Sequence, residues 1–581
     1  MEQKQKPRVL VLDADMVPAL TISRSLSHRN CVVDVASDTI NPLIRYSNSV
    51  NAVFQYPDPL AVPELFVQWL LEHTRNTYYD LVIPVTERSL VALSEHRGLL
   101  SHIRLAMPGP ACLEVALDKA KTLALAAEIG VPLPHSITVS RLDELVDLRQ
   151  SLKFPLVLKP VRSIGSATGG SSQLQVSYAF DMAELESGCA RVLQFGPVLL
   201  QEFFSGIGVG VELIARHGKV HYAFQHQRLH EVPLTGGGSS LRKSEPVMQP
   251  LLEAAERLMA ALDWTGVAMV EFKLDPQSHK FCLMEINGRF WGSLPLAVAA
   301  GADFPSMLLD LELGGEVSPS RPYRNNIYCR LLSRDIHWYE AVLRGGVDKR
   351  IAHVPTGWEV FKGLGLFFHF RHRFDVQSIK DPVPGFVDAG RVLKSYFHRT
   401  LALSREKAFF SRQRRAWRKG VVAAAVANAG SMLFVCYGNI NRSALADVMV
   451  RAYAEDSGIS VTSAGFHQQD GRPADVVMAD VAAQFGVDMR AMRSVCVTTQ
   501  MLHDSDIIFV MEKSHYDRVC AMDSSIADKV YLLGAHSNAA EWPAEIADPY
   551  GRARTDYLAC YERIAEAVDN IKSVIAVRVN D

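Results

Sequence analysis

Short apolar strands alternate with helices at both ends of this chain, and no other feature constrains its fold as strongly. Near the start, the strand-like stretches RVLVLDA, CVVDVAS and LVIPV are separated by helical patterns such as ELFVQWLLEHT. Near the end, SMLFVCY, SVTSAGF, DIIFVME and KVYLLG repeat the alternation. Strands that alternate with helices form parallel sheets covered on both faces. We therefore predict an α/β domain over residues 1–108 and a second, doubly wound α/β domain over residues 429–581.

The middle of the chain has a different pattern. Residues 109–318 contain β runs such as PVLLQEFF, GVGVELIARHG and GVAMVEFKLD, which favour an α+β domain with much antiparallel pairing. The stretch LEVALDKAKTLALAAEIG predicts one helix that ends at Gly130. Residues 319–428 are predicted to be a connecting region that is mostly helical. The total length of 581 residues fits about four domains.

A strongly basic segment lies near the end of the connecting region. Residues 391–419 contain ten Lys or Arg residues and one acidic residue, Glu406. Two interpretations remain open. The segment is either a solvated connecting helix, or a helix whose Phe and Trp side chains also contact an anionic membrane or an acidic partner.

Composition narrows the classes of function. The formal net charge of −2 gives no reason to expect nucleic acid as a partner. Nine scattered cysteines without a CxxC pair predict reduced thiols and a cytoplasmic location. The N-terminal stretch lacks the apolar segment of a signal peptide. The most apolar window, residues 420–438, is interrupted by polar residues and predicts a helix end, a turn and a strand, with a membrane contact as a minor alternative.

A lysine and a glycine- and serine-rich loop follow one central strand. Lys159 stands at the end of FPLVLKP, within the loop-bearing stretch 157–172. Backbone N–H groups of such a loop can bind phosphate oxygens, to which a lysine adds charge, although many such loops only make a turn. Gln201 and Glu202 end another strand, where exposed backbone and a carboxylate suit an adenine edge and a ribose hydroxyl.

Two further strands carry carboxylates and an amide. Glu271 lies in VEFKLD, while Glu285, Asn287 and Arg289 lie in LMEINGR. Glu285 and Asn287 are two positions apart, so they face the same side of a strand. Two carboxylates and an amide oxygen are hard ligands suited to Mg²⁺ (or Mn²⁺) that also contacts phosphate. Arg289 can hold a transferred phosphoryl group. A salt-bridged hairpin would explain the Glu and Arg residues, but not Asn287.

Together these motifs resemble the ATP-grasp superfamily of carboxylate–amine ligases, over about residues 8–318. The segment EINGRFWGSLPLAVAAGADFP is similar to the family's ExNxR segment, and residues 1–108 resemble the Rossmann-like domain that precedes an ATP-grasp domain. The resemblance implies that ATP phosphorylates a small carboxylate and that an amine then attacks the acyl-phosphate. It implies the following nucleotide ligands: Lys119, Lys159, Gln201 and Glu202.

Two arginines lie where that family often contacts its substrate. Arg228 and Arg242 flank the stretch RLHEVPLTGGGSSLR. They could hold a carboxylate or the acyl-phosphate, and they could equally be surface arginines. The sequence does not identify the carboxylate or the amine.

The stretch LFVCYGNINRSAL contains a cysteine loop between a strand and a helix. Cys436 is separated by five residues from Arg442, and Ser443 follows. A thiolate attacks phosphorus, so loop N–H groups and a helix N-terminus pointing at the sulfur would favour the reaction. Arg442 offers a bidentate fork to phosphate oxygens. Ser443 could donate to the thiolate, and Asn439 tolerates the unusual backbone of such a loop. By itself the spacing is also compatible with a buried structural cysteine.

Attack of a thiolate on a phosphate ester also needs an acid that protonates the leaving oxygen. Asp548 stands in EIADPYGRA with Tyr550 beside it, although Asp-Pro alone also marks a turn. With VTSAGF, GRPAD and DIIFVMEKSH between them, these motifs resemble the low-molecular-weight protein tyrosine phosphatases over about residues 431–577. The resemblance implies Cys436 as nucleophile, Arg442 as phosphate clamp and Asp548 as general acid, acting on phosphotyrosine proteins or small phosphomonoesters.

One position departs from that family's pattern. Asn441 stands where the family often has a second cysteine, which can trap the oxidised nucleophile as a disulfide. The chain is therefore predicted to be a bifunctional enzyme, an ATP-dependent ligase fused to a phosphatase. The alternative is a phosphatase regulated by a nucleotide-sensing ATP-grasp region. A non-enzymatic interaction protein is disfavoured because both sets of reactive residues are present. The sequence gives no prediction of the oligomeric state.

Overall fold

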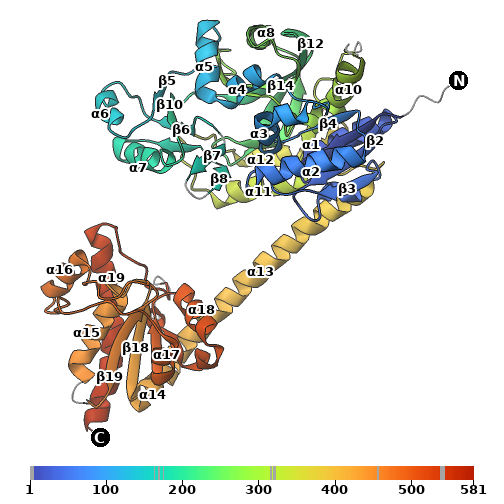
Figure 1. Ribbon diagram of the computed structural model, residues 1–581. Helices are drawn as coiled ribbons and strands as arrows, with labels where there is room; N and C mark the ends of the chain where they lie inside the picture. The colour runs from blue at the N-terminus through green and yellow to red at the C-terminus, as the bar shows by residue number, and fades with distance from the viewer. Residues whose placement is uncertain are drawn as a thin grey trace. The chain divides into compact units, whose positions relative to one another are not determined.

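The computed structural model divides into two compact units, Met1–Lys394 and Ser395–Asp581 (Figure 1). The finer boundaries expected near residues 108, 318 and 428 stay predictions. Side chains of residues 164–167, 170–173 and 579–580 are not described. The structure describes residues 6–162, 164–167, 170–173, 176–314, 317, 322–454, 457–536 and 543–580.

The chain begins with a four-stranded parallel sheet in the order β3-β2-β1-β4. Alternate residues of β1 enter two different cores. Val9 and Val11 pack with α1, whereas Leu10 packs with α2 and α3 on the other face, as expected from the period of a strand. The elements are β1 (Arg8–Val11), α1 (Val17–His28), β2 (Val32–Ser37), η1 (Leu43–Tyr46), β3 (Ala52–Gln55), α2 (Pro63–Asn76), β4 (Leu81–Ile83), α3 (Glu87–Glu95) and η2 (Arg97–Leu100).

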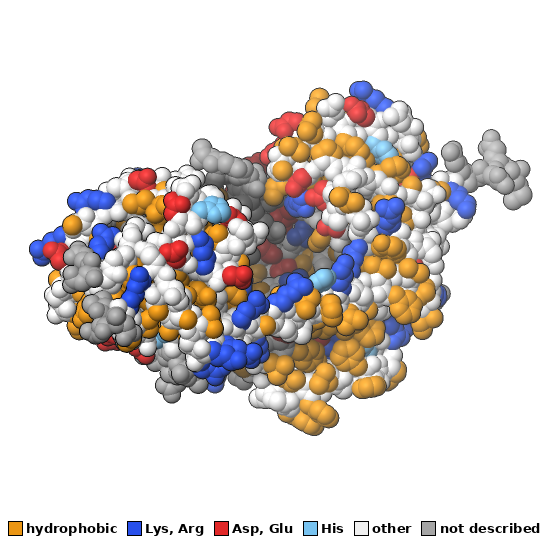
Figure 2. All heavy atoms as spheres, turned by 90° about the horizontal axis from the view of Figure 1, so that it is seen from below, with side chains coloured by type: hydrophobic (Ala, Val, Ile, Leu, Met, Phe, Trp, Pro, Cys, Tyr) orange, Lys and Arg blue, Asp and Glu red, His pale blue; other side chains and the backbone are white. Residues whose placement is uncertain are grey.

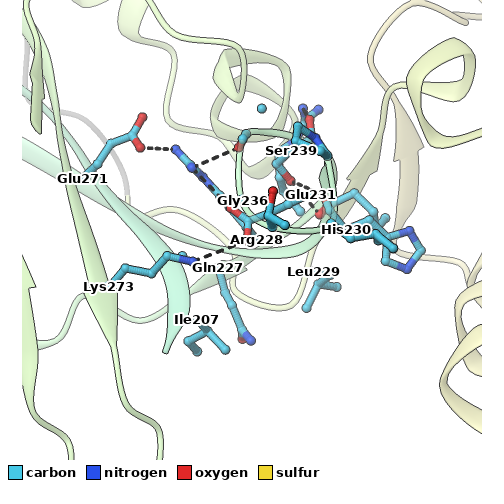
Figure 3. A pocket seen from close by; sticks show the side chains of 18 of the residues that line it. Ile207, Gln227, Arg228, Leu229, His230, Glu231, Gly236, Ser239, Glu271 and Lys273 are labelled. Carbon is cyan, nitrogen blue, oxygen red and sulfur yellow. Dashed lines mark hydrogen bonds and ion pairs between the residues drawn. The ribbon is translucent and has the colours of Figure 1, made fainter. Parts of the chain in front are cut away.

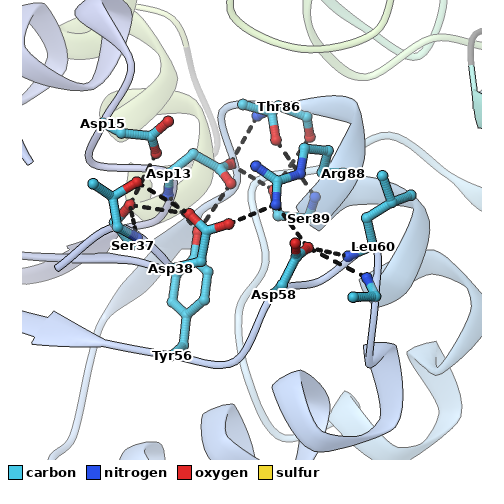
Figure 4. Close-up of polar contacts among 12 residues, drawn as sticks. Asp13, Asp15, Ser37, Asp38, Tyr56, Asp58, Leu60, Thr86, Arg88 and Ser89 are labelled. Carbon is cyan, nitrogen blue, oxygen red and sulfur yellow. Dashed lines mark hydrogen bonds and ion pairs between the residues drawn. The ribbon is translucent and has the colours of Figure 1, made fainter. Parts of the chain in front are cut away.

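Polar side chains join the carboxyl ends of these strands (Figure 4). Asp13, after β1, accepts hydrogen bonds from the backbone N–H of Thr86 at 2.8 Å and from Ser89 Oγ at 2.6 Å. Arg88 bridges Asp38 and Asp58, at 2.5 and 2.7 Å. These contacts fix the start of α3, whose first turn bears Glu87, the ion-pair partner of Arg289.

Antiparallel sheets follow, which agrees with the predicted α+β region. A four-stranded sheet has the order β5-β10-β6-β9, and a seven-stranded sheet the order β15-β14-β11-β12-β13-β16-β17. The first comprises β5 (Ser136–Val139), β6 (Leu156–Pro160), β9 (Ser177–Ala179) and β10 (Val198–Glu202), with helices α6 (Glu144–Leu148) and α7 (Met182–Val192) and the hairpin β7 (Ile164–Ala167)–β8 (Gly170–Gln173).

The seven-stranded sheet packs against α8 on one face, where Leu251, Leu258 and Trp264 join a buried cluster with Val211 and Val270. Its only parallel pair is β16 with β17 among the strands described. The elements are β11 (Ile207–Arg216), β12 (Lys219–Val232), β13 (Gly238–Glu245), α8 (Gln249–Ala261), β14 (Gly266–Leu274), β15 (Phe281–Asn287), α9 (Leu294–Ala300), α10 (Phe304–Gly314), β16 (Tyr328–Arg330) and β17 (His372–Phe374).

The helix expected to run to Gly130 is in fact two helices, α4 (Pro110–Leu117) and α5 (Lys119–Glu128). The break occurs at Asp118, which has extended backbone angles and whose side chain accepts a hydrogen bond from Lys121 N at 3.0 Å. An aspartate that caps a helix in this way satisfies a free backbone N–H group. The break places Lys119 at the first position of α5, where its backbone N–H donates to Val161 O.

The connecting region is mostly helical, as predicted, and it contributes α11 (Leu332–Arg344), α12 (Gly357–Gly365), η3 (Leu366–Phe368) and α13 (Pro382–Arg418). The last turns of α13 belong to the second unit. Gln413 Oε1 accepts from Leu532 N at 2.9 Å, and Trp417 Nε1 donates to Leu532 O at 3.0 Å. These side chains cover the open edge of β21, so the basic segment is only partly solvated.

The second unit is a parallel sheet in the order β19-β18-β20-β21. Phe434 and Cys436 of β18 face α15 and α19, while Leu433 and Val435 face the opposite layer with α17 and α18. The elements are α14 (Val421–Asn428), β18 (Ser431–Cys436), α15 (Arg442–Ala454), β19 (Ser460–Gly465), α16 (Val476–Gln484), α17 (Thr499–Asp504), β20 (Ile507–Val510), α18 (Lys513–Met522), η5 (Ser524–Lys529), β21 (Val530–Leu532), η6 (Leu533–His536) and α19 (Arg554–Asn580). The predicted α/β fold class is confirmed at both ends of the chain.

Within the described ranges, no single helix is both long and apolar enough to cross a membrane, whereas the sharply bent pair α9–α10 passes that test only when its two helices are taken together.

Candidate active sites

A large pocket of about 2230 Å³ opens in the first unit, between the antiparallel sheets and the connecting region. All of the residues predicted there from sequence line it. They are Lys119, Lys159, Gln201, Glu202, Arg228, Arg242, Glu271, Glu285, Asn287 and Arg289. Most of the glycine- and serine-rich loop predicted to bind phosphate falls on residues whose side chains, or whole placement, lie outside the described part of the chain.

A partly buried lysine lines the pocket. Lys159 Nζ, on β6, donates to Gln201 Oε1 on the neighbouring β10 at 2.6 Å. Burial lowers the pKa of Lys159, and the carboxylate of Glu285 partly opposes that shift. Conversely, burial opposes ionisation of Glu285, but Lys119 and Lys159 hold the pKa of its carboxyl group below the ordinary value. The charges of Lys119, Lys159 and Glu285 therefore influence one another.

Two carboxylates and an amide meet on the paired strands β14 and β15. Glu271 and Glu285 are direct cross-strand partners. Asn287 Nδ2 lies 3.0 Å from Glu271 Oε1 and 3.4 Å from Glu285 Oε1. A flip of the Asn287 amide would turn its oxygen toward a cation held between the two carboxylates. The described residues contain no group of three or more His, Cys, Asp or Glu side chains arranged for a metal, and this cluster is of another type, two carboxylates with one amide.

Arg228 occupies the centre of the pocket (Figure 3). Its Nη2 atom lies 2.5 Å from Glu271 Oε2, and its Nη1 atom lies 3.4 Å from Glu231 Oε1. Lys273 approaches Glu231 from the other side, at 3.6 Å. Burial opposes the charge on Arg228, but Glu271 and Glu231 raise the pKa of its guanidinium. Arg228 is therefore a buried, permanently charged group beside the carboxylate cluster.

The other two arginines are held by different partners. Arg242 is 1% exposed, forms an ion pair with the buried Asp375 and donates to Ser239 O at 3.1 Å. Arg289 Nη2 lies 3.1 Å from Glu87 Oε1. Arg289 therefore ties the carboxylate cluster to the first sheet.

Residues 331–369, predicted only as part of a connecting region, contribute many of the residues that line the pocket. His230 stacks on Trp338 with ring centroids 3.5 Å apart. Its Nδ1 atom lies 2.7 Å from Asp335 Oδ1, and Asp335 also pairs with the buried Arg330. This network joins α11 to the central sheet. The amphipathic pattern of LSRDIHWYEAVLR was the one available signal of that packing.

In the second unit, the cysteine loop lies between the end of β18 and the start of α15. Cys436 is 2% exposed, and its sulfur accepts hydrogen bonds from Asn439 N at 3.2 Å and from Ser443 Oγ at 3.0 Å. Asn439 adopts a φ of 53°, which an asparagine tolerates better than most residues. Its Nδ2 donates to Ser443 Oγ at 2.9 Å. The loop thus directs donors, and the N-terminus of α15, toward the sulfur.

Arg442 begins α15 and is buried among anionic groups. Its Nη2 atom lies 2.7 Å from Asp548 Oδ2, its Nη1 atom donates to Ile546 O at 2.8 Å, and Nη1 also pairs with Glu512. Burial opposes the charge on Arg442, but Cys436, Asp548 and Glu512 raise the pKa of its guanidinium. Burial likewise opposes ionisation of Glu512, yet the hydrogen bond from Arg442 holds the pKa of Glu512 below its ordinary value.

Comparison with known proteins identifies this arrangement. Residues 431–579 match the family model described as low molecular weight phosphotyrosine protein phosphatase. The probable low molecular weight protein-tyrosine-phosphatase AmsI of Erwinia amylovora is 37% identical over 131 residues, which are 22% of this chain and 87% of AmsI. The chain belongs to the low molecular weight protein-tyrosine-phosphatase family. We call its second unit the phosphatase domain.

The first unit also has a match. Residues 194–333 match the family model described as ATP-grasp in the biosynthetic pathway with Ter operon. The carbamoyl phosphate synthase arginine-specific large chain of Lactiplantibacillus plantarum is 23% identical over 295 residues, 48% of this chain and 28% of that protein. The crystal structure of L-amino acid ligase from Bacillus licheniformis matches at 16% identity and a TM-score of 0.42, over 55% and 78% of the two chains. The chain joins an ATP-grasp ligase-like region to a phosphatase domain, which confirms the predicted two-part enzyme.

In the phosphatase domain, the structure brings together Cys436, Asn439, Arg442, Ser443 and Asp548. Tyr550, by contrast, is 65% exposed. Two polar residues in motifs of this domain also contact the site, although the motifs alone indicate no role for them. These residues are Glu512 in MEKSH, which pairs with Arg442, and Arg472 in GRPAD, whose Nη2 donates to Gly438 O at 2.5 Å.

The position of Glu512 offered a signal for its role. It follows β20, a parallel neighbour of β18, and the carboxyl ends of parallel strands meet at one edge of a sheet.

Proposed function

We propose that the phosphatase domain hydrolyses phosphomonoesters, with phosphotyrosine of a protein or a small phosphomonoester as substrate. One observation carries the proposal: the sulfur of Cys436 accepts two hydrogen bonds while Arg442 lies against Asp548. The thiolate of Cys436 attacks phosphorus and forms a cysteinyl-phosphate. Asp548 protonates the leaving oxygen, and as a carboxylate it then takes a proton from the water that attacks the cysteinyl-phosphate.

The neighbouring groups have supporting roles in this proposal. Arg442 holds two phosphate oxygens with its guanidinium. Ser443 donates to the sulfur and stabilises the thiolate both before attack and as it leaves. Asn439 keeps the loop in the conformation that points its N–H group at the sulfur. Tyr550, exposed beside Asp548, would contact the aromatic part of a phosphotyrosine substrate.

Replacement of the nucleophile tests the phosphatase proposal. Cys436→Ser is expected to abolish hydrolysis of p-nitrophenyl phosphate. Cys496→Ser is the matched control, because Cys496 lies in the same domain and contacts no residue of the cysteine loop among its described hydrogen bonds. Unchanged hydrolysis by Cys436→Ser would overturn the assignment.

We further propose that the ATP-grasp region joins a small carboxylate to an amine, with ATP as the phosphoryl donor. The observation that carries this proposal is that Asn287 contacts both Glu271 and Glu285 in the pocket that Lys159 also lines. Lys119 and Lys159 would neutralise phosphate oxygens, and Gln201 with Glu202 would bind the adenine and ribose. Arg228, Arg242 and Arg289 would hold the carboxylate and the transferred phosphoryl group.

The carboxylate cluster fits Mg²⁺ (or Mn²⁺) by the chemistry of its donors, two carboxylates and one amide within hydrogen-bonding distance. Glu271, Glu285 and Asn287 would hold the ion, whose charge would offset that of the phosphate oxygens. Arg228 now pairs with Glu271. If Glu271 held the metal ion, Arg228 would have to release Glu271 and would then be free to bind a substrate anion.

Turnover of ATP with a panel of carboxylates and amines tests the ligase proposal. ADP that appears only with one carboxylate–amine pair would support it and name the substrates, whereas AMP would exclude an acyl-phosphate. Glu285→Gln should abolish that turnover, and Glu253→Gln, an exposed change on α8, should not. The alternative, a nucleotide sensor that regulates the phosphatase, would show ATP binding without ADP formation and a change in phosphatase rate on adding ATP.

We also infer a cytoplasmic location and no nucleic-acid partner. All nine cysteines are unpaired, and several of them are buried. This state is the usual one in a reducing compartment.

A further inference from the structure

The surface of the connecting region carries an unusual group of exposed aromatic side chains. Trp358, Phe361 and Leu364 of α12 recur every third residue, so they share one face of the helix. Phe368 and Phe370 follow in η3 and the next turn. Trp358 and Phe361 are 62% and 63% exposed, Phe368 is 94% exposed and Phe370 is 75% exposed. These five residues are called the aromatic face below.

The opposite face of the same helix is firmly anchored. Gly363 O accepts a hydrogen bond from the buried Arg330 at 2.7 Å. A Cβ atom at Gly363 would lie 3.3 Å from the ring of His230, so the helix packs closely on β12. Gly363 and Leu366 line the ATP-grasp pocket. The helix therefore has one side fixed in the pocket wall and one side that no described residue covers.

Basic side chains accompany the aromatic face. Residues 357–374 contain Lys362, Arg371 and Arg373 and one acidic residue, Glu359, whose carboxylate is used in capping α12. The Lys362 ammonium lies 5.5 Å from the ring centroid of Trp358, and the Arg371 guanidinium 5.2 Å from that of Phe370. On the surface drawn in Figure 2, hydrophobic side chains lie beside Lys and Arg side chains.

We propose that the aromatic face docks on an anionic lipid surface. Trp and Phe side chains beside Lys and Arg are the composition of helices that lie in the membrane interface, with the rings among the headgroups and acyl chains. The excess of positive charge complements anionic headgroups. A soluble protein gains nothing from leaving so many large aromatic side chains in water. The proposal concerns residues 357–373 and does not depend on the ligase reaction.

Vesicle sedimentation of the full chain tests the proposal. The protein should bind vesicles of phosphatidylcholine with phosphatidylglycerol, and bind pure phosphatidylcholine and high-salt samples more weakly. The triple variant Trp358→Ser/Phe361→Ser/Phe368→Ser should bind the anionic vesicles at least about tenfold more weakly. Tyr78→Ser/Leu99→Ser, which removes two exposed apolar side chains from the first sheet's domain, should bind like the parent. Thermal unfolding of each variant, followed by circular dichroism, reports whether the first unit, which carries the substitutions, is folded.

Fluorescence locates the contact. Lipids brominated on their acyl chains should quench the tryptophan emission of the parent protein. Trp358→Phe should keep the sedimentation and lose most of the quenching. Arg371→Ala/Arg373→Ala should weaken binding to anionic vesicles while leaving phosphatase activity unchanged.

Three results would overturn the proposal. The first is no sedimentation of the parent protein with anionic vesicles. The second is binding that the triple variant retains but that Lys394→Ala/Arg405→Ala/Lys407→Ala in α13 abolishes, because the basic helix would then be the membrane contact. The third is a parent dimer in light scattering that the triple variant converts to a monomer without any change in vesicle binding, because a second copy would then cover the aromatic face.

Discussion

Arg442 Nη2 and Asp548 Oδ2 lie 2.7 Å apart although the two residues are 106 positions apart in the chain. The pair places the proposed general acid beside the proposed phosphate clamp. When a phosphate dianion takes the guanidinium of Arg442, Asp548 loses its cationic partner.

The loss of activity when Asp548 is replaced should depend on the leaving group of the substrate. Asp548→Asn is expected to lower kcat for phenyl phosphate by about 10²–10⁴, because phenolate is a poor leaving group that needs the proton. The loss for p-nitrophenyl phosphate should be much smaller. Steady-state kinetics with the two substrates measures the difference, and Asp556→Asn at the exposed start of α19 is the control. Equal losses with both substrates would contradict the assignment of Asp548 as general acid.

His515 should make the phosphatase domain sensitive to acid. Burial lowers the pKa of His515 to about 4, and the charge of Arg442 adds to the effect. Unfolded histidine titrates near pH 6.5, so between about pH 6.5 and about pH 4 only the unfolded state takes up the proton, and stability falls as the pH falls. His515→Asn removes this loss.

The measurement is the urea concentration that halves phosphatase activity, across that pH range. The parent should lose roughly 2–3 kcal/mol of unfolding free energy relative to His515→Asn between the two ends of the range. Parallel pH dependences of parent and variant would show that His515 does not titrate as its burial implies.

Lys159 should be needed for nucleotide binding. Lys159→Met keeps most of the side-chain volume and removes the charge beside Gln201, so the Kd for ATP should rise by about 10–100-fold. Calorimetry with ATP measures the change. Lys121→Met is the matched control, since Lys121 is exposed and pairs with Glu114. An unchanged Kd for Lys159→Met would place the phosphates elsewhere in the pocket.

Phe434 supports the strand that carries the nucleophile. It is fully buried and stacks on Phe509 with ring centroids 5.3 Å apart. Phe434→Ala should destabilise the phosphatase domain by about 3–5 kcal/mol. The urea midpoint for loss of phosphatase activity should fall, while ATP binding by the first unit stays unchanged. Simultaneous loss of both would show that the units do not unfold separately.

Asn441 should decide how the enzyme responds to oxidation. Asn441 is 3% exposed and lies in the cysteine loop. Peroxide is expected to inactivate the parent in a way that dithiothreitol does not fully reverse, because position 441 in the cysteine loop offers the oxidised Cys436 no thiol. Dithiothreitol should restore most of the phosphatase activity of peroxide-treated Asn441→Cys. Mass spectrometry of the Cys436 peptide distinguishes a disulfide from sulfinic acid, and equal recovery of parent and variant would contradict the prediction.

Local spacing made much of both sites predictable. Glu285 and Asn287 could be placed on one face because a strand repeats every two residues. Cys436 and Arg442 could be placed around a loop because an apolar strand precedes them and a helix follows. The break at Asp118 was not predicted, because helix periodicity continues across it. The structure shows the two contacts found at the break, from Lys121 N to the Asp118 side chain and from Lys119 N to Val161 O.

Sequence by itself determined the alternating elements at both ends and the antiparallel middle, because each of these follows from periodicities within a few positions. The proposed site residues came from short motifs together with the family resemblance. Only the tertiary structure decided that Glu512 pairs with Arg442, that Gln413 covers the edge of β21, and that residues 331–369 form a wall of the ATP-grasp pocket. Those contacts depend on which strands lie side by side and on how distant segments pack, and no local pattern specifies that.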